Sequence, residues 1–182
     1  MALSATMYRF DVELSDVDRG VYEQLELRAA LHPSEAPRYM LTRVLAYCLC
    51  YEEGIAFSHG LAAADEPAVW IKDLQGTLQA WIEIGSPAAE RLHKARKAVP
   101  RVVVFTHNAV EGFKKSLRGK HIHRAEEIEL YAFEPAFLDA LAALTERTNR
   151  WTIARNDGEL YVTAKDKTVS ARLERHALAD PE

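Results

Sequence analysis

The run Arg101–Thr106 constrains the fold more than any other part of the sequence. Its letters, RVVVFT, place three valines and a phenylalanine in succession. A strand with this pattern is buried on both faces, so it must lie inside a sheet that other elements cover. Helix-like segments flank it at Ala88–Ala98 and Ala109–Leu117. The order of these segments predicts a layer in which helices alternate with strands.

The middle of the chain supplies the neighbours of this strand. Ala68–Lys72 and Leu78–Ile84 are separated by turn residues and predict a β-hairpin in the same sheet as Arg101–Thr106. An apolar stripe with a glycine just beyond it predicts a helix over Pro37–Glu53 that packs on this sheet. The remaining predicted elements of the middle are the strand Glu129–Phe133 and the helix Ala136–Leu144.

Both ends of the chain are rich in strand patterns. Thr6–Leu14 alternates apolar and polar residues, and Val21–Ala29 returns after a turn. The strands predicted near the C-terminus are Trp151–Arg155, Leu160–Thr163 and Val169–Leu173. We expect the two ends to pair into a second sheet, so that residues 1–182 form a single α+β domain.

The composition excludes several classes of protein. The chain has 182 residues, of which 48% are hydrophobic and 27% charged, and this excludes disordered and coiled-coil proteins. Its longest stretch without a formal charge, Gly54–Ala64, is shorter than the roughly 18 residues of a membrane span. Cys48 and Cys50 would point to nearly opposite sides of a helix, so they cannot bridge each other. We expect a cytoplasmic monomer with no membrane association.

Charge is distributed unevenly along the chain. The net charge is -4, yet residues 91–124, here called the basic sector, contain ten Lys or Arg and one acid, Glu111. The rest of the chain contains 13 basic and 26 acidic residues. A basic sector on an acidic protein predicts a phosphate-binding surface, and the alternative is two basic helix faces that only meet solvent. The candidate nucleic-acid-binding residues are Arg91, Lys97, Arg101, Lys114, Lys115 and Arg118.

Several nucleotide-binding and catalytic motifs are absent from the sequence. No two glycines are closer than six residues, which excludes GxGxxG and the P-loop. GxSxG, CxxC and HExxH are also missing. His121 and His123 would share one face of a strand, but zinc needs at least one more ligand. We therefore favour surface histidines in a basic loop over a zinc site.

Acidic side chains gather around the predicted hairpin. Asp65 and Glu66 open its first strand, and Glu83 lies near the end of the second. Antiparallel pairing would set Glu83 opposite Glu66 and Pro67. Carboxylates this close repel each other unless a proton or a cation lies between them, which favours an Mg²⁺ or Mn²⁺ site. The alternative is that the first two acids only flank a loop and Glu83 is a polar residue at a strand end.

Charged residues on the two neighbouring helices bear on the same site. Glu52 and Glu53 would lie at the negative end of the first helix dipole, where acids are unfavourable without a cation or basic partner. Arg91 and Lys94 share one face of the second predicted helix. They would face a phosphate group, or alternatively Lys94 pairs with Glu90 one turn earlier.

Short motifs occur in order along residues 32–108. They are His32-Pro33-Ser34-Glu35, Arg43 with Leu45-Ala46, Asp65-Glu66-Pro67 with Trp70, Trp81-Ile82-Glu83-Ile84-Gly85, Arg91 with Lys94-Ala95, and Phe105-Thr106 with Asn108. Together they resemble the bacterial YaeQ family, and the ordered set is more specific than any single motif. The resemblance implies a variant of the PD-(D/E)xK restriction-endonuclease-like fold, with a mixed sheet flanked by helices.

The same resemblance implies a metal site. In the PD-(D/E)xK fold, acids from one helix and two strands hold a divalent cation, Mg²⁺ or Mn²⁺. Carried over to this sequence, Glu53 resembles the helix acid, and Asp65 or Glu66 resembles the acid of the first strand. Glu83 resembles the acid of (D/E)xK.

Two positions depart from the pattern that the resemblance implies. The residue two after Glu83 is Gly85 rather than lysine, so Lys94 on the following helix would take the role of the catalytic lysine. Arg91 would help Lys94 to stabilise charge on the phosphate. Gln79 is an amide where we expect an acid in the family, which weakens the expected metal site.

Three functions are consistent with these observations. The first is a metal-dependent phosphodiesterase that acts on nucleic acid. The second, which Gly85 and Gln79 favour, is a non-catalytic nucleic-acid-binding or regulatory module on a degenerate nuclease fold. The third is a protein–protein adaptor in which the acids are structural. The fold alone does not choose among them, because one fold hosts many functions.

Overall fold

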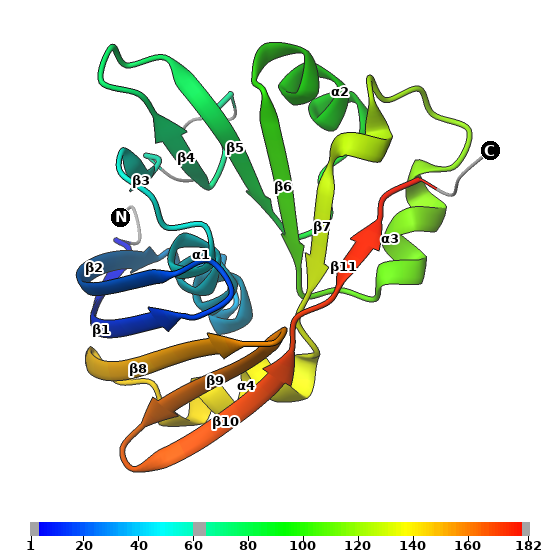
Figure 1. Ribbon diagram of the computed structural model, residues 1–182. Coiled ribbons are helices and arrows are strands. Elements are labelled where there is room, and N and C mark those ends of the chain that lie inside the picture. Colours follow the sequence, from blue (N-terminus) through cyan, green and yellow to red (C-terminus); the bar gives the residue numbers. More distant parts are fainter. Residues whose placement is uncertain (1–3, 60–64, 180–182) are drawn as a thin grey trace. The chain divides into compact units, whose positions relative to one another are not determined.

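The computed structural model describes residues 4–59 and 65–179 and divides them into two compact units (Figure 1). The first unit consists of residues 4–49 and 133–173, and the second of residues 50–132 and 174–179 with the same internal gap. Within the described residues each unit contains one mixed sheet and two α-helices. The predicted α+β class with two sheets is therefore confirmed.

The sheet of the first unit joins the two ends of the chain. Its order is β10-β9-β8-β1-β2. The bounds are β1 Thr6–Asp16, β2 Val21–Leu31, β8 Thr148–Asn156, β9 Glu159–Ala164 and β10 Lys167–Arg172. β1 runs antiparallel to β2 and parallel to β8, with Val12 beside Trp151. The sheet expected from the N- and C-terminal strands is present, and it forms around β1.

Two helices complete the first unit, α1 (Pro37–Leu49) and α4 (Pro135–Leu144). They pack against each other, and α1 also contacts β2. The prediction that the first helix extends to Glu53 is wrong, and the structure assigns α1 to the first unit. The chain leaves the helix after Leu49. Gly54, where the sequence predicted the helix to have just ended, adopts a φ of 93°, which lies outside the helical range. The apolar side chains of α1 belong to the core of the first unit.

The sheet of the second unit has the order β11-β7-β6-β5-β4-β3. The bounds are β3 Ile55–Phe57, β4 Val69–Lys72, β5 Leu78–Ile84, β6 Arg101–Thr106, β7 Glu129–Ala132 and β11 Arg175–Ala177. β5, β6 and β7 run parallel, as strands joined by crossover helices do. The predicted hairpin and the run Arg101–Thr106 share this sheet, as expected. The short strands β3 and β11 were not predicted.

The crossover helices α2 (Ala89–Ala98) and α3 (Val110–Leu117) cover the same face of this sheet. Their apolar side chains, such as Leu92 and Phe113, join Val102 and Val104 of β6 in one buried cluster. All four apolar residues of the central run, 102–105, are at most 1% exposed, so β6 is buried on both faces as its sequence predicts.

A substitution at Gly54 tests how closely the backbone before β3 approaches Lys72 in β4. A Cβ atom at this position would lie 1.9 Å from the carbonyl oxygen of Lys72, and its φ of 93° strains any other residue. Gly54→Ala should therefore lower the free energy of unfolding by at least about 2 kcal/mol. Gly76→Ala is the matched control, because its φ of 82° is also positive but nothing lies within 4 Å. We expect it to cost about 1 kcal/mol in denaturant unfolding. Equal losses for both variants would contradict the close approach at Lys72.

Candidate functional site

The hairpin of β4 and β5 sets the position of Glu83. Val69 pairs with Ile82 and Lys72 with Leu78, and the register shifts by one residue between Ile71 and Lys72. Without this bulge Glu83 would fall opposite Pro67, but the extra residue in β5 moves it opposite Ala68. The predicted alignment of Glu83 with Glu66 and Pro67 is therefore wrong by one to two residues. A bulge cannot be recognised from the alternation alone.

Glu83 is buried and ion-paired. Its carboxylate oxygen Oε1 accepts hydrogen bonds of 2.5 Å from the Trp81 indole and from Nε of Arg91, and the side chain is 7% exposed. Burial raises the pKa of Glu83, and the donors Trp81 and Arg91 oppose that rise. Glu83 is thus the buried partner of Arg91 in an ion pair.

Arg91 ties this carboxylate to the segment before β4. Its Nη2 donates to the backbone carbonyl of Glu66 at 2.5 Å, and its guanidinium lies 5.5 Å from the centre of the Trp81 ring. The carboxylate of Glu66 has a different partner, because it accepts hydrogen bonds from the backbone and the ring of His59. Burial acts to raise the pKa of Glu66, but the hydrogen bonds and charge of His59 outweigh it and the pKa is lowered.

The other proposed metal ligands are not gathered around Glu83. Glu53 is exposed in the turn that precedes β3, and Asp65 is exposed at the start of the β4 segment. Gln79 donates to the carboxylate of Asp73 at 2.9 Å and so closes the hairpin turn. Among the described residues, no group of three or more His, Cys, Asp or Glu side chains is placed to hold a metal ion. This arrangement does not fit the divalent cation that the nuclease pattern implies.

The remaining predicted site residues line a pocket or support a loop. Lys94 forms an exposed ion pair with Glu90 at 3.1 Å, which is the local alternative considered for it. Lys94 and Arg91 line a pocket of about 380 Å³ together with Asp65 and Trp81. The side chain of Asn108 donates to Ser86 at 2.9 Å and joins the ends of β5 and β6. Gly85 has a φ of 94°, so this turn favours glycine over lysine.

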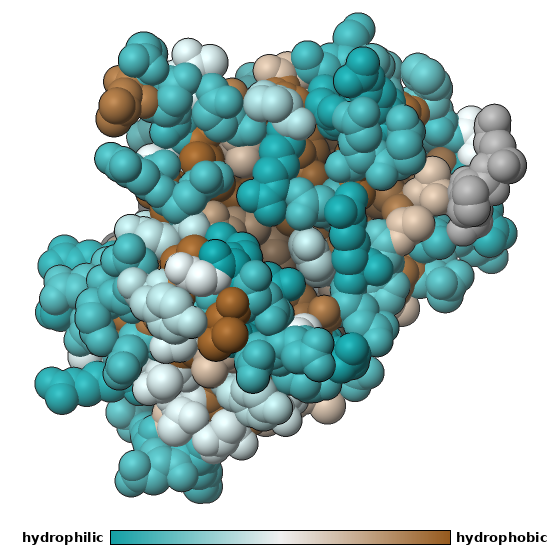
Figure 2. Space-filling view, in the orientation of Figure 1, coloured by the Kyte–Doolittle hydropathy of each residue, from teal (hydrophilic) through white to brown (hydrophobic). Residues whose placement is uncertain are grey.

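At least five of the ten Lys and Arg side chains of the basic sector form an ion pair with an acid among the described residues; these are Arg91, Lys94, Arg96, Arg101 and Arg124. Besides Glu83 and Glu90, the partners include Glu129 for Arg101 and Glu127 for both Arg96 and Arg124. Arg101 donates to Glu129 at 2.6 Å; this hydrogen bond raises the pKa of Arg101, although burial opposes the rise. Across the described part of the chain, Lys97, Lys115, Arg118 and Lys120 have no acidic partner. Hydrophilic side chains cover most of α2 in Figure 2.

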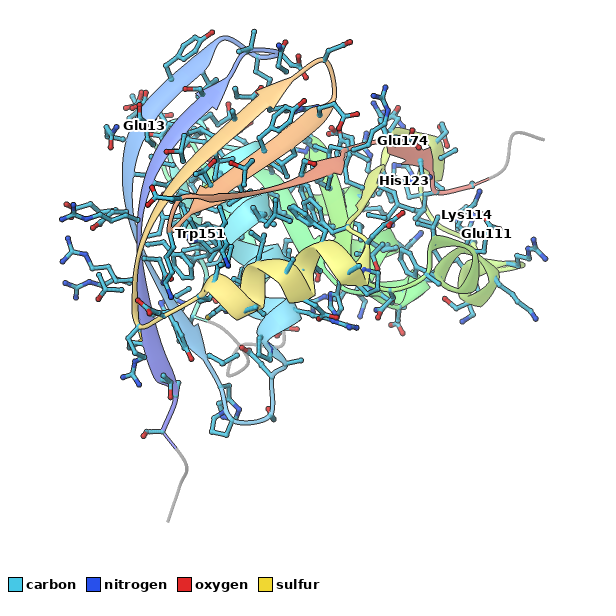
Figure 3. The ribbon with its side chains drawn as sticks, turned by 90° about the horizontal axis from the view of Figure 1, so that it is seen from below. Glu13, Glu111, Lys114, His123, Trp151 and Glu174 are labelled. Carbon is cyan, nitrogen blue, oxygen red and sulfur yellow. The ribbon has the colours of Figure 1, made fainter. Side chains whose placement is uncertain are left out.

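A group of three histidines was not predicted. His93 of α2 lies 5.2 Å from His121 and 6.4 Å from His123, measured between ring centres. The backbone N–H of His123 donates to Nδ1 of His93 at 3.1 Å. Figure 3 labels His123. Burial, followed by positive charges led by Arg124, lowers the pKa of His123. The sequence analysis identified only His121 and His123, and these two lie in a loop, as the favoured interpretation expected.

The fold and these motifs agree with known proteins. Residues 1–173 match the family described as "YaeQ protein". The chain belongs to the YaeQ family. It is 29% identical to the YaeQ protein of Escherichia coli K12 over 95% of this chain and 96% of the relative. A YaeQ protein of Salmonella typhi is 37% identical over 60% of each chain.

Two crystal structures of YaeQ proteins have the same fold. The protein from Xanthomonas axonopodis pv. citri superposes with a TM-score of 0.87 and 30% identity, over 94% of this chain and 98% of the other. The protein from Pseudomonas syringae gives a TM-score of 0.84 and 30% identity, over 94% and 95%. The two-sheet architecture is thus that of the YaeQ family. In the described part of this YaeQ chain, no helix is long and apolar enough to cross a membrane.

The ion pair of Glu83 predicts a pH-dependent effect of Arg91→Met. Without the guanidinium, the buried carboxylate keeps only the Trp81 donor, and the pKa of Glu83 rises further. The folded protein then binds a proton more tightly than the unfolded chain, so stability falls as pH rises above the ordinary pKa of 4.5. We expect a loss of about 1–3 kcal/mol at neutral pH and a smaller loss at about pH 5, measured by denaturant unfolding.

Two controls separate this effect from a general loss of charge. Lys94→Met removes a neighbouring cation whose ion pair is exposed, so it should cost at most about 0.5 kcal/mol at either pH. In a Glu83→Gln background, Arg91→Met should lose its pH dependence because no carboxylate remains to titrate. A loss for Arg91→Met that is the same at both pH values would contradict the buried pair.

Proposed function

We propose that this protein binds the phosphate backbone of nucleic acid through its second unit and does not hydrolyse it. In this proposal the second unit is a PD-(D/E)xK-like core that keeps a basic surface but has lost its metal site. One observation carries the proposal: Lys97, Lys115, Arg118 and Lys120 have no acidic partner among the described residues, whereas Glu83 is paired with Arg91. Cations without partners are available to phosphates, and a buried, paired carboxylate is not available to a metal.

The free cations are grouped on the helices that cover one face of the sheet. Lys97 lies in the last turn of α2, Lys115 lies in the last turn of α3, and Arg118 and Lys120 follow that helix. Such side chains bind phosphates by charge and release counterions, and they do not read bases. The proposed partner is therefore a nucleic acid of any sequence, and its affinity should depend strongly on salt.

Salt dependence tests this proposal. Fluorescence anisotropy with a labelled single-stranded oligonucleotide should give a negative slope of log K against log salt, by about 0.7 for each phosphate neutralised. Lys115→Gln with Arg118→Gln should weaken binding similarly for unrelated sequences and reduce the slope by about 0.7 per residue. Lys167→Gln is the matched control, since it removes one exposed charge from β10 in the first unit. Binding that neither salt nor the double substitution changes would contradict the proposal and favour the adaptor function.

Metal-dependent hydrolysis is the second candidate function. It is favoured by the pocket of about 380 Å³ beside Glu83, which brings Asp65, Arg91 and Lys94 to one rim. The two candidates differ in their response to Mg²⁺ or Mn²⁺, because an ion that binds only the folded protein raises its stability by mass action.

We expect millimolar Mn²⁺ to shift the melting temperature of the wild type no more than that of Glu83→Gln, because Arg91 already neutralises Glu83. Circular dichroism melts with and without the ion measure this. Incubation of a labelled oligonucleotide with Mn²⁺ and the protein should leave it intact. A stabilisation by Mn²⁺ that Glu83→Gln abolishes, together with cleavage of the strand, would replace the binding function with hydrolysis.

A further inference from the structure

A second pocket, distinct from the one beside Glu83, lies at the end of α3. Its volume is about 270 Å³, and it is formed by the end of that helix, the loop that follows and the segment after β11. The residues that line it are Lys114, Leu117, Arg118, Gly119, Lys120, His121, Ile122, Ala125, Leu178 and Ala179. Among these described residues three are cationic, one is a histidine and none is acidic.

Helix electrostatics explain only part of this charge. Lys114 and Arg118 lie at the C-terminus of α3, where the helix dipole favours cations. Lys120 and His121 lie beyond the helix in the loop, where the dipole falls off, and both are exposed. Neither Arg118 nor Lys120 has an acidic partner among the described residues. Lys120 thus adds to the pocket a positive charge that the helix dipole does not account for.

The floor of the pocket is apolar. Leu117 and Leu178 are buried, and Ile122 and Ala125 pack against the same cluster under α2 and α3. A concave site with charge of one sign and apolar walls focuses its electrostatic field, so an anion inside is attracted more strongly than one on a flat surface. The site therefore favours an anionic group that enters it over one that passes across it.

The loop that carries these cations is held in place. Lys120 donates its backbone N–H to the carbonyl of Leu117 at 3.1 Å, and His123 donates its backbone N–H to His93. Gly119 and Arg124 adopt left-handed backbone conformations, with φ of 73° and 46°. Binding therefore requires little additional ordering of the loop, which lowers its entropic cost.

We propose that this pocket binds the terminal phosphate of a nucleic-acid strand. A terminal phosphate monoester carries about −1.5 to −2 charges at neutral pH, whereas each internal diester carries one. The pocket is smaller than the roughly 300–1,000 Å³ sites of drug-sized ligands, so it suits a phosphate with part of its sugar. This inference rests on the proposed function, since it assigns a strand end to the same basic surface.

Three labelled oligonucleotides of one sequence test the inference, with a phosphate at the 5′ end, at the 3′ end, or at neither. We expect one of the phosphorylated strands to bind about tenfold more tightly than the unphosphorylated strand, because an added charge-assisted contact is worth at least that factor. Arg118→Gln with Lys120→Gln should remove this preference. Lys97→Gln should weaken all three strands alike, because Lys97 does not line the pocket.

Each outcome distinguishes the inference from the proposed function. Inorganic phosphate at millimolar concentration should compete away the preference and leave the weaker, salt-dependent binding. Salt-dependent binding with equal affinity for all three strands would overturn the terminal-phosphate site and leave backbone binding intact. Binding to none of the strands would overturn both. The exposed substitutions should leave the melting temperature unchanged, and a preference that survives them would also refute the site.

Discussion

The ion pair between Glu83 and Arg91 organises the second unit. The guanidinium contacts two segments: β5, through the carboxylate of Glu83 and the ring of Trp81, and the residues ahead of β4, through the backbone carbonyl of Glu66. Arg91 belongs to α2, so the pair also holds that helix against β5. A buried carboxylate without such a partner would cost several kcal/mol in desolvation, of the order expected for buried ions. The surroundings of Glu83 therefore depend on this one arginine.

The distribution of charge follows from how the parallel strands are arranged. The basic sector is almost free of acids in sequence, but β7 and the turn before it bring Glu127 and Glu129 beside Arg96 and Arg101. These two acids therefore neutralise cations at the end of α2 and the start of β6. Lys115, Arg118 and Lys120, in the last turn of α3 and just beyond it, have no acidic partner within the described residues. The surface proposed to bind phosphates is the part of the basic sector whose cations have no acidic partner among the described residues.

Much of the architecture could be predicted from residue patterns, and the site could be predicted only in part. The three valines and the phenylalanine of β6 predict a strand that is buried on both faces, and the alternation of β1 predicts one that is buried on a single face. The pair Asp157-Gly158 is typical of a two-residue hairpin loop, and in the structure both residues adopt the positive φ that such a loop needs. The bulge beside Lys72, the partner of Glu66 at His59 and the approach of His93 to His121 depend on contacts between distant residues. Spacing alone carries no signal for them.

The parallel pairing of β1 with β8 has a consequence for biosynthesis. β1 is synthesised well before its parallel partner, which begins at Thr148, so one hydrogen-bonding edge of β1 stays open until β8 has been made. The last strand of the other sheet, β11, ends at Ala177 and is later still. The first sheet is complete only after β10 has been made and the second only after β11, and an unpaired strand edge on a nascent chain is open to wrong pairing. In both sheets, pairing between strands that are distant in sequence is therefore a late step of folding.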